Sequence, residues 1–231
     1  MTLTTFTLPV LGASAWFEQD PGGLEAGFLD LACGKPCLDE VEPLQRRRLS
    51  PLARGVLHCA GRLGGKGDLR MVFASRHGES ARTLGLLRDL AAGTELSPAL
   101  FAMSVHNAVP GLLTILRGNR AACTALSAGA ESFGYGLLEA FAAWKAEPGT
   151  PMLLLYGEEP LPELWTPFVP QEAAHAVGVL LGAEGRPLTL RWDPDGRGPD
   201  GSGQSRAFLE ALGAGAAAWA GPTARWEWSL A

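Results

Sequence analysis

The stretch that decides the fold is residues 97–140, SPALFAMSVHNAVPGLLTILRGNRAACTALSAGAESFGYGLLEA. Residues 106–117 have a helical pattern, and Pro110 fits such a helix only because it falls in the first turn. The small side chains of 121–128 predict a strand, and residues 133–146 again predict a helix. A helix, a strand and a second helix in direct succession indicate an α/β unit.

Segments of the same kind flank this stretch on both sides. Ser50 and Pro51 mark a helix start, with an N-cap residue followed by proline at the first helical position. Upstream we expect strands at 3–11 and 69–74, helices at 50–63 and 80–92, and loop with short helical pieces over 20–48. Downstream we expect strands at 152–156, 174–182, 187–192 and 225–230, and a helix from about 205 to 219. The pattern predicts a single α/β domain over residues 1–231, with a mixed, mostly parallel sheet covered by helices on both faces.

Composition excludes several classes of function. The 231 residues are 47% hydrophobic and 19% charged, which is enough apolar material for a sizeable core. A net charge of −5 argues against a nucleic-acid partner, because such binding depends on Lys and Arg contacts with phosphates. No apolar stretch reaches the roughly 20 residues that a membrane span needs. Four cysteines without a secretion signal predict reduced thiols and a cytoplasmic protein.

Neither a cofactor nor a metal is expected. Cys33, Cys37, His58 and Cys59 offer four zinc-ligand types, but their spacing is irregular and lacks the usual two-residue knuckle. The glycines of residues 61–67 lack the strand–loop–helix order and the Lys-Ser/Thr ending of a phosphate loop.

The polar run Ser75, His77, Glu79 and Ser80 is better interpreted as a turn with a helix cap than as a hydrolase site. Members of a catalytic triad come from separate elements, and these residues share one short loop. His106 is interpreted as a hydrogen-bonded structural histidine, although a functional role for either histidine stays open.

Residues in 97–140 also resemble a known family, the β-ketoacyl synthases of the thiolase superfamily. The matching positions, in order and without a gap, are Ser97-Pro98, Asn107, Gly111, Gly118 and Arg120. In that family, a strand after these residues ends in a nucleophilic cysteine at the start of a buried helix. The resemblance therefore implies a thiolase-like fold and a position for that cysteine.

Neither alignment of this stretch puts a thiol at the nucleophile position. The gapless register, which we prefer, places it at Ala130. A second register, with a deletion of about four residues, pairs Thr124-Ala125-Leu126-Ser127 with the family's Thr-Ala-Cys-Ser and places it at Leu126. Neither side chain can attack a thioester, since acyl transfer needs a thiolate. Cys123 lies earlier in the predicted strand and is expected to be a small buried core residue.

The whole chain resembles a single amino-terminal thiolase-type unit, since its last hundred residues lack a His-Gly-Thr motif. It is similar to the short chain-length-factor-like subunits found beside ketosynthases in aryl polyene pathways. The resemblance implies pairing with a full-length ketosynthase, with an acyl carrier protein involved only indirectly. The implied interface is the strand Ala121, Ala122, Cys123, Thr124, Ala125, Leu126 and Ser127. The implied floor of the partner's acyl tunnel is Leu100, Phe101, Met103 and Val105.

The sequence thus favours a non-catalytic chain-length-factor-like subunit in polyene or fatty-acid-like biosynthesis. The alternative is a free-standing thioester hydrolase or acyl-transfer enzyme that uses Ser127 or Cys123. A third hypothesis is a homodimeric acyl-binding module without chemistry.

Overall fold

A computed structural model describes residues 3–64, 67–169, 171–199, 201 and 203–230. Its strands are β1 (Thr4–Phe17), β2 (Leu29–Cys33), β3 (Arg70–Ala74), β4 (Cys123–Leu126), β5 (Met152–Glu158), β6 (His175–Leu181), β7 (Arg186–Asp193), β8 (Ala216–Ala220) and β9 (Arg225–Leu230). Its α-helices are α1 (Pro43–Arg46), α2 (Pro51–Leu63), α3 (Ser80–Ala91), α4 (Pro98–Ala102), α5 (Ala108–Arg117), α6 (Ser132–Ala146) and α7 (Gln204–Ala214). A short 3-10 helix spans Glu163–Trp165.

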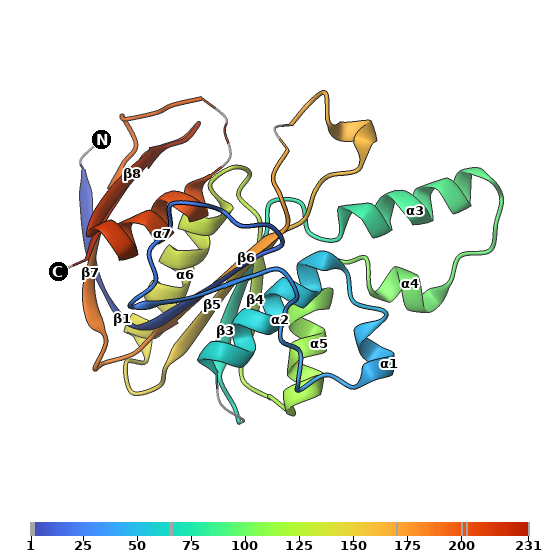
Figure 1. Ribbon diagram of the computed structural model, residues 1–231, viewed down its shortest axis with the longest axis horizontal. Coiled ribbons are helices and arrows are strands. Elements are labelled where there is room, and N and C mark those ends of the chain that lie inside the picture. The colour runs from blue at the N-terminus through green and yellow to red at the C-terminus, as the bar shows by residue number, and fades with distance from the viewer. Residues whose placement is uncertain (1–2, 65–66, 170, 200, 202, 231) are drawn as a thin grey trace.

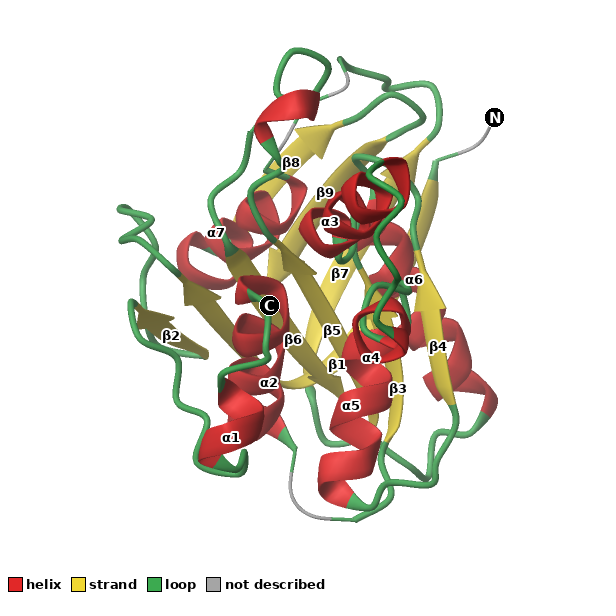
Figure 2. Cartoon of the chain, turned by 90° about the vertical axis from the view of Figure 1, so that its right-hand side faces the viewer, coloured by secondary structure: helices red, strands yellow, loops and turns green. Residues whose placement is uncertain are grey.

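The described strands form one sheet in the order β4-β3-β5-β6-β1-β7-β9-β8, with β2 paired to β1 (Figure 1). Helices cover both of its faces, as predicted. Alternate residues of β3 show this: Met71 and Phe73 pack with α2 and α5, whereas Val72 and Ala74 pack with α6 and α7. Figure 2 shows α2 and α5 in front of the sheet and β4 at its free edge.

The sheet is mixed, as expected, but it is not mostly parallel. Three strand pairs are parallel (β1–β2, β3–β4 and β3–β5) and five are antiparallel (β1–β6, β1–β7, β5–β6, β7–β9 and β8–β9). Parallel pairing needs a crossover between strands, usually a helix. The first part of the chain has such crossovers, whereas β6 runs into β7, and β8 into β9, with short connections.

The opening strand is longer than the 3–11 expected, because β1 continues to Phe17. A register shift between Val10 and Gly12 separates its two halves. The first half pairs with β7, and the second half pairs with β6 and β2. One strand therefore joins the two ends of the sheet, a long-range arrangement that local alternation of apolar residues did not reveal.

Other differences lie at element boundaries. The helix expected over 205–219 ends at Ala214, where Gly215 adopts a φ of 90°, and residues 216–220 form strand β8. The strand expected over 121–128 is confined to Cys123–Leu126, and the helix expected from 106 begins at Ala108. Residues 98–102 form the short helix α4, which the sequence did not indicate.

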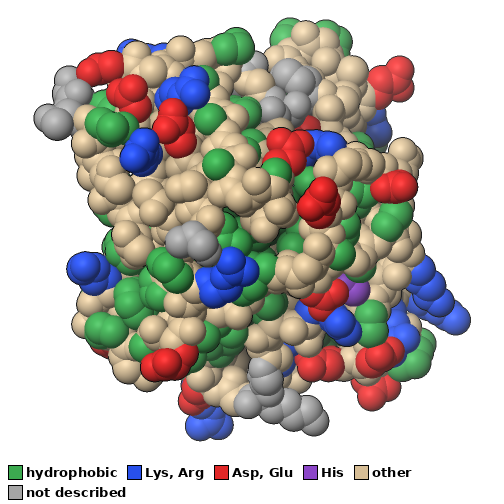
Figure 3. Space-filling view, turned by 60° about the vertical axis from the view of Figure 1, so that its left-hand side comes forward, with side chains coloured by type: hydrophobic (Ala, Val, Ile, Leu, Met, Phe, Trp, Pro, Cys, Tyr) green, Lys and Arg blue, Asp and Glu red, His purple; other side chains and the backbone are tan. Residues whose placement is uncertain are grey.

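Local signals at helix ends are confirmed. The side chain of Ser50 accepts a hydrogen bond from the Ala53 N–H at 3.0 Å, with Pro51 as the next residue. Gly118 ends α5 with a φ of 64°, a conformation that costs glycine little. On the face seen in Figure 3, acidic and basic side chains are interspersed among apolar ones. No helix of the described residues is long and apolar enough to cross a membrane.

Candidate functional site

Strand β4 lies at an open edge of the sheet, with β3 as its hydrogen-bonded neighbour among the described strands. Backbone N–H groups at β3 donate to the carbonyls of Ala122 and Leu126, at 3.1 and 3.3 Å. Backbone groups of successive residues in a strand point in opposite directions within the sheet. The N–H and C=O groups of Cys123 and Ala125 therefore point outward, where another strand could pair with them.

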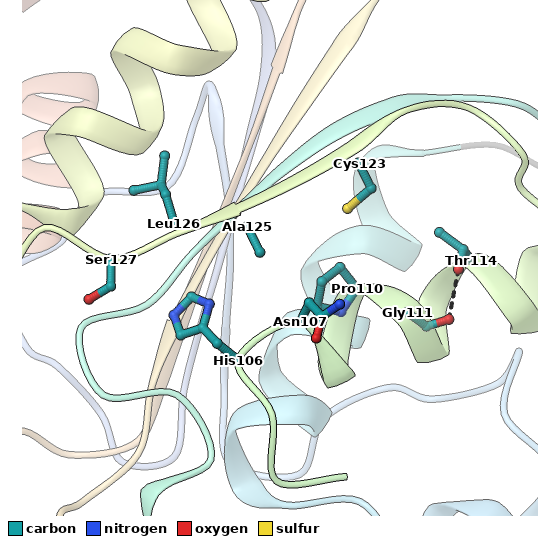
Figure 4. Close-up of a pocket in the computed structure, with 9 residues that line it drawn as sticks. All are labelled: His106, Asn107, Pro110, Gly111, Thr114, Cys123, Ala125, Leu126 and Ser127. Carbon is teal, nitrogen blue, oxygen red and sulfur yellow. Dashed lines mark hydrogen bonds between the residues drawn. The ribbon is translucent and has the colours of Figure 1, made fainter. Parts of the chain in front are cut away.

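The side chains along this edge are small and mostly open to solvent. Cys123, Thr124 and Ala125 are exposed and Leu126 is half-buried. In Figure 4, Cys123 and Ala125 point to the side of the sheet on which α5 lies, and Leu126 points to the opposite side. The prediction of a buried Cys123 is wrong, because β4 is an edge strand. Partial burial of its thiol nevertheless raises the pKa of Cys123.

A hollow of about 590 Å³ lies between this strand and α5. Figure 4 shows its lining: His106, Asn107, Pro110, Gly111, Thr114, Cys123, Ala125, Leu126 and Ser127. His106 is fixed by its Nε2, which donates to the Ser75 carbonyl at 3.1 Å, and by its ring, which lies 5.4 Å from that of Phe73. The hollow therefore opens beside the edge strand with one oriented imidazole in its wall.

The two candidate nucleophile positions lie on either side of the turn that leads into α6. Leu126 is the last residue of β4, and Ala130 is half-buried two residues before α6. Neither carries a nucleophilic atom. The neighbouring Ser127 hydroxyl donates to the Arg76 carbonyl at 3.0 Å. A cavity of about 20 Å³ is lined by Ala130 together with His77 and Glu158.

The same turn is anchored by Glu131, which the sequence did not single out. Its side chain is 1% exposed. One carboxylate oxygen accepts the backbone N–H groups of Thr223 and Ala224, at 2.7 and 3.2 Å. The other accepts the Thr223 hydroxyl and the Trp226 indole N–H, at 2.5 and 3.3 Å. These bonds stabilise a buried charge and fix the turn against the β8–β9 hairpin.

A second group of buried carboxylates lies beyond the carboxyl ends of β3 and β5. Glu79, Glu158 and Glu159 are each at most 5% exposed. Glu79 accepts hydrogen bonds from the Ser50 hydroxyl at 2.6 Å and from Arg82 at 2.8 Å. Burial raises the pKa of Glu158 to about 7, and burial together with the charge of Glu79 raises the pKa of Glu159 to about 7. The pair Glu158 and Glu159 at the end of an apolar strand was the feature of the sequence that could have indicated this group.

The residues expected at the tunnel floor lie on α4 and just after it. Leu100, Phe101 and Val105 are 46%, 59% and 41% exposed, and Met103 is half-buried. Such exposure of large apolar side chains on one segment is typical of a surface that contacts a partner or ligand. The structure therefore brings the strand residues together at one edge and keeps the α4 residues in a separate apolar segment.

The remaining candidates do not form sites. The structure places Cys33 and Cys37 as exposed free thiols and Cys59 as a buried one. Within the described residues, no three His, Cys, Asp or Glu side chains are placed to hold a metal ion. Glu79 caps no helix through its side chain but takes part in the carboxylate group described above.

Solved structures with the same fold include ketosynthases and ketosynthase–chain length factor complexes. One is "Ketosynthase (ApeO) in Complex with its Chain Length Factor (ApeC) from Xenorhabdus doucetiae", with a TM-score of 0.78 and 26% identity over 97% of this chain and 99% of the matched chain. Another is the ishigamide ketosynthase/chain length factor, with a TM-score of 0.62 and 14% identity over 82% of this chain and 67% of that one. A β-ketoacyl synthase from Burkholderia phymatum has a TM-score of 0.51 and 12% identity, over 74% of this chain and 54% of its own.

Comparison of sequences gives the family directly. Among curated protein sequences, none matches the chain. The family model "Beta-ketoacyl synthase, N-terminal domain" matches residues 29–229, which include the edge strand, the turn and the carboxylate group. The chain belongs to the β-ketoacyl synthase family and represents its amino-terminal, thiolase-like domain.

Proposed function

We propose that this chain is a non-catalytic, chain-length-factor-like subunit that pairs with an active ketosynthase and shapes its acyl tunnel. The acyl chains would be those of polyene or fatty-acid-like biosynthesis, delivered to the partner by an acyl carrier protein. The attacking thiolate would belong to the partner, in the cytoplasm where both chains act. Residues 1–231 would form one domain of that subunit.

The observation that carries this proposal is an open edge strand beside a nucleophile position that has no nucleophile. Cys123 and Ala125 direct their backbone hydrogen-bonding groups outward, and small side chains let a second strand approach closely. Leu126 and Ala130, the two candidate positions, have no atom that could accept an acyl group. An edge built to pair and a site unable to react support a partner that does the chemistry.

The solved structures support a ketosynthase as that partner. The matched chain from Xenorhabdus doucetiae is covered over 99% of its length, and it comes from a complex of a ketosynthase with its chain length factor. We infer that the residues Ala121 to Ser127 form the pairing strand here. Continuous pairing of two sheets would satisfy the outward backbone groups in both chains.

The exposed segment around α4 supports the second part of the proposal. Leu100, Phe101 and Val105 would be buried on assembly, and Met103 would lie with them at the end of the partner's tunnel. Side chains at a closed tunnel end limit product length sterically, because a longer chain meets a clash.

Coexpression with the ketosynthase from the same gene neighbourhood tests the pairing. We expect one heterodimer by size-exclusion chromatography and mass photometry, with condensation activity in the complex and none in this chain alone. Separate elution of the two chains at micromolar concentration would contradict the proposal. Condensation by the isolated chain would contradict its non-catalytic part.

A second candidate function is thioester hydrolysis by Ser127 or Cys123, favoured by their position with His106 around one hollow. Two observations weigh against it. The Ser127 hydroxyl donates to a backbone carbonyl, and the raised pKa of Cys123 disfavours its thiolate. Turnover of a thioester by the isolated chain, abolished by Ser127→Ala or Cys123→Ala, would establish this alternative.

A further inference from the structure

A serine and a histidine lie close together near the group of buried carboxylates described above. They are on the side of that group that is farther from β4. His175 begins β6, and Ser205 is the second residue of α7. Their Oγ and Nε2 atoms are 3.0 Å apart. Both side chains line a hollow of about 280 Å³ whose rim includes Phe17, Asp20 and Glu172.

The hydrogen bonds around His175 define the direction of this contact. Its Nδ1 lies 2.9 Å from the Ala173 carbonyl, which can only accept, so Nδ1 carries the proton of the neutral ring. Nε2 is then an acceptor, and the Ser205 hydroxyl donates to it. The ring is held between Phe17, parallel within 13° at 5.7 Å, and Tyr156, also at 5.7 Å.

This is the arrangement that a serine nucleophile needs: a base within hydrogen-bond reach, itself oriented by a third group. The Glu172 carboxylate lies 3.7 Å from Nε2, where it would stabilise the imidazolium formed when Nε2 takes the serine proton. Ser205 lies in the first turn of an 11-residue helix. The first-turn N–H groups of a helix lack intrahelical acceptors and can stabilise a developing oxyanion.

The geometry points to a reactive site in this chain that is separate from the unreactive nucleophile position and takes no part in condensation: Ser205, activated by His175, accepts short uncharged acyl groups from thioesters or activated esters. The hollow is near the lower limit of about 300–1,000 Å³ for small-molecule sites, which favours short acyl groups. Asp20 and Glu172 at its rim disfavour an acyl group that carries a carboxylate. Arg206 does not offset them, because it pairs with Glu210 and with the carbonyls of Pro21 and Gly22.

The reaction balances without a further reagent except water. The Ser205 oxygen attacks the acyl carbonyl carbon while its proton moves to His175 Nε2. The carbon–sulfur bond then breaks, and the departing thiolate takes that proton to leave as a thiol. In the second half, water attacks the acyl-serine and gives its proton to Nε2. The carbon–Oγ bond breaks, the carboxylic acid leaves, and Ser205 regains its proton. This site does not depend on the pairing with a ketosynthase proposed above.

The test uses the full chain, p-nitrophenyl acetate and intact-mass detection of an acetyl adduct. We expect one adduct on the peptide containing Ser205, and at least a 100-fold slower acylation in Ser205→Ala. His175→Gln keeps a hydrogen-bonding side chain without its basicity, and we expect a similar loss. Ser229→Ala, an exposed serine on β9, is the matched control and should acylate at the wild-type rate.

Two further measurements keep the test decisive if an alanine variant folds poorly. Ser205→Cys should be alkylated by iodoacetamide at a rate that falls at least tenfold when His175→Gln is added. Acetyl-N-acetylcysteamine should acylate the chain at least tenfold faster than malonyl-N-acetylcysteamine. A wild-type chain that neither gains an adduct nor releases p-nitrophenolate faster than Ser205→Ala, or a Ser205→Ala chain that is acylated at the wild-type rate, would overturn the proposal.

Discussion

The two ends of the sheet are both short strands of small residues, β4 and β8. They differ in what surrounds them. At one end, β8 is joined to β9 in a hairpin and packs against α7, and the Gly198 N–H donates to Gly221 just beyond it at 2.8 Å. At the other end, β4 has β3 on one side and exposed side chains along its length. Small residues alone therefore do not distinguish the two edges, and the difference lies in the hairpin, helix and loop contacts that only β8 has.

The largest effect is expected from proline at an outward-facing backbone position of β4. Ala125→Pro removes an N–H that points away from β3 and blocks strand pairing there. We expect at least a 100-fold loss of ketosynthase affinity, measured by biolayer interferometry.

The matched control is Ala218→Pro on β8, also exposed and facing away from its neighbouring strand. It should leave the affinity within twofold of the wild type. Equal losses in the two variants would erase the distinction between the edges.

A second prediction asks whether the β4 end also sets product length. Met103→Ala shortens a side chain that we place at the tunnel floor, so the assembled complex should release products longer by one or two two-carbon units. Mass spectrometry of the products would measure this. Leu87→Ala, an exposed leucine on α3, is the control and should leave the distribution unchanged. An unchanged distribution for Met103→Ala would remove α4 from the tunnel.

A third prediction concerns pH, because the buried carboxylates lie on the β4 side of the sheet. Glu158 has its pKa raised by burial from 4.5 to about 7 in the folded chain. The folded state then binds more protons than the unfolded state between these values. The free energy of unfolding is therefore highest below pH 4.5 as far as this group is concerned, and it falls as pH rises through about 7. Between pH values below 4.5 and above 7, the expected loss in the free energy of unfolding from this group is on the order of 3 kcal/mol.

Urea unfolding at pH 5.5 and 8 would measure this slope. Glu158→Gln, a neutral side chain of the same size, should lower this slope by about half, because Glu159 has a similarly raised pKa and keeps its share. Glu184→Gln in the exposed β6–β7 turn should leave the slope as it is in the wild type. A slope in Glu158→Gln equal to that of the wild type would contradict the assignment to Glu158.

The smallest effect is expected for thiol labelling. Cys123 lies on the edge strand with a raised pKa, so iodoacetamide at pH 8 should modify it severalfold more slowly than the exposed Cys33. Binding of the partner should slow Cys123 further and leave Cys33 unchanged. Equal protection of both cysteines would indicate that the partner binds elsewhere.

Features decided by neighbours in the chain could be read from the sequence. Ser50 with Pro51 opens a helix, because caps and backbone preferences act within a few residues. The layered α/β fold followed from the same local patterns. The resemblance of residues 97–140 to ketosynthases gave the family, which the match over residues 29–229 confirms.

Features decided by contacts between distant residues could not be predicted from the sequence. Residues 216–220 are alanine-rich, which favours a helix locally, but pairing with β9 makes them a strand. Cys123 was expected in the core because nothing in a small-residue strand tells which edge of a sheet it forms. The contact of His175 with Ser205 joins residues 30 positions apart in two elements, so no spacing rule indicated it. The assignments of the pairing strand and tunnel floor remain predictions.

The side-chain hydrogen bonds of Glu131 limit when the turn before α6 can be stabilised during synthesis. Its nearest donor lies 92 residues later, in the last hairpin of the chain. During synthesis, the turn beside β4 can be secured only after that hairpin has left the ribosome. The turn of a nascent chain therefore lacks these bonds until residues 223–226 have been synthesised. Changes at Thr223 or Trp226, far from β4 in sequence, would weaken the turn beside β4 as well as the hairpin.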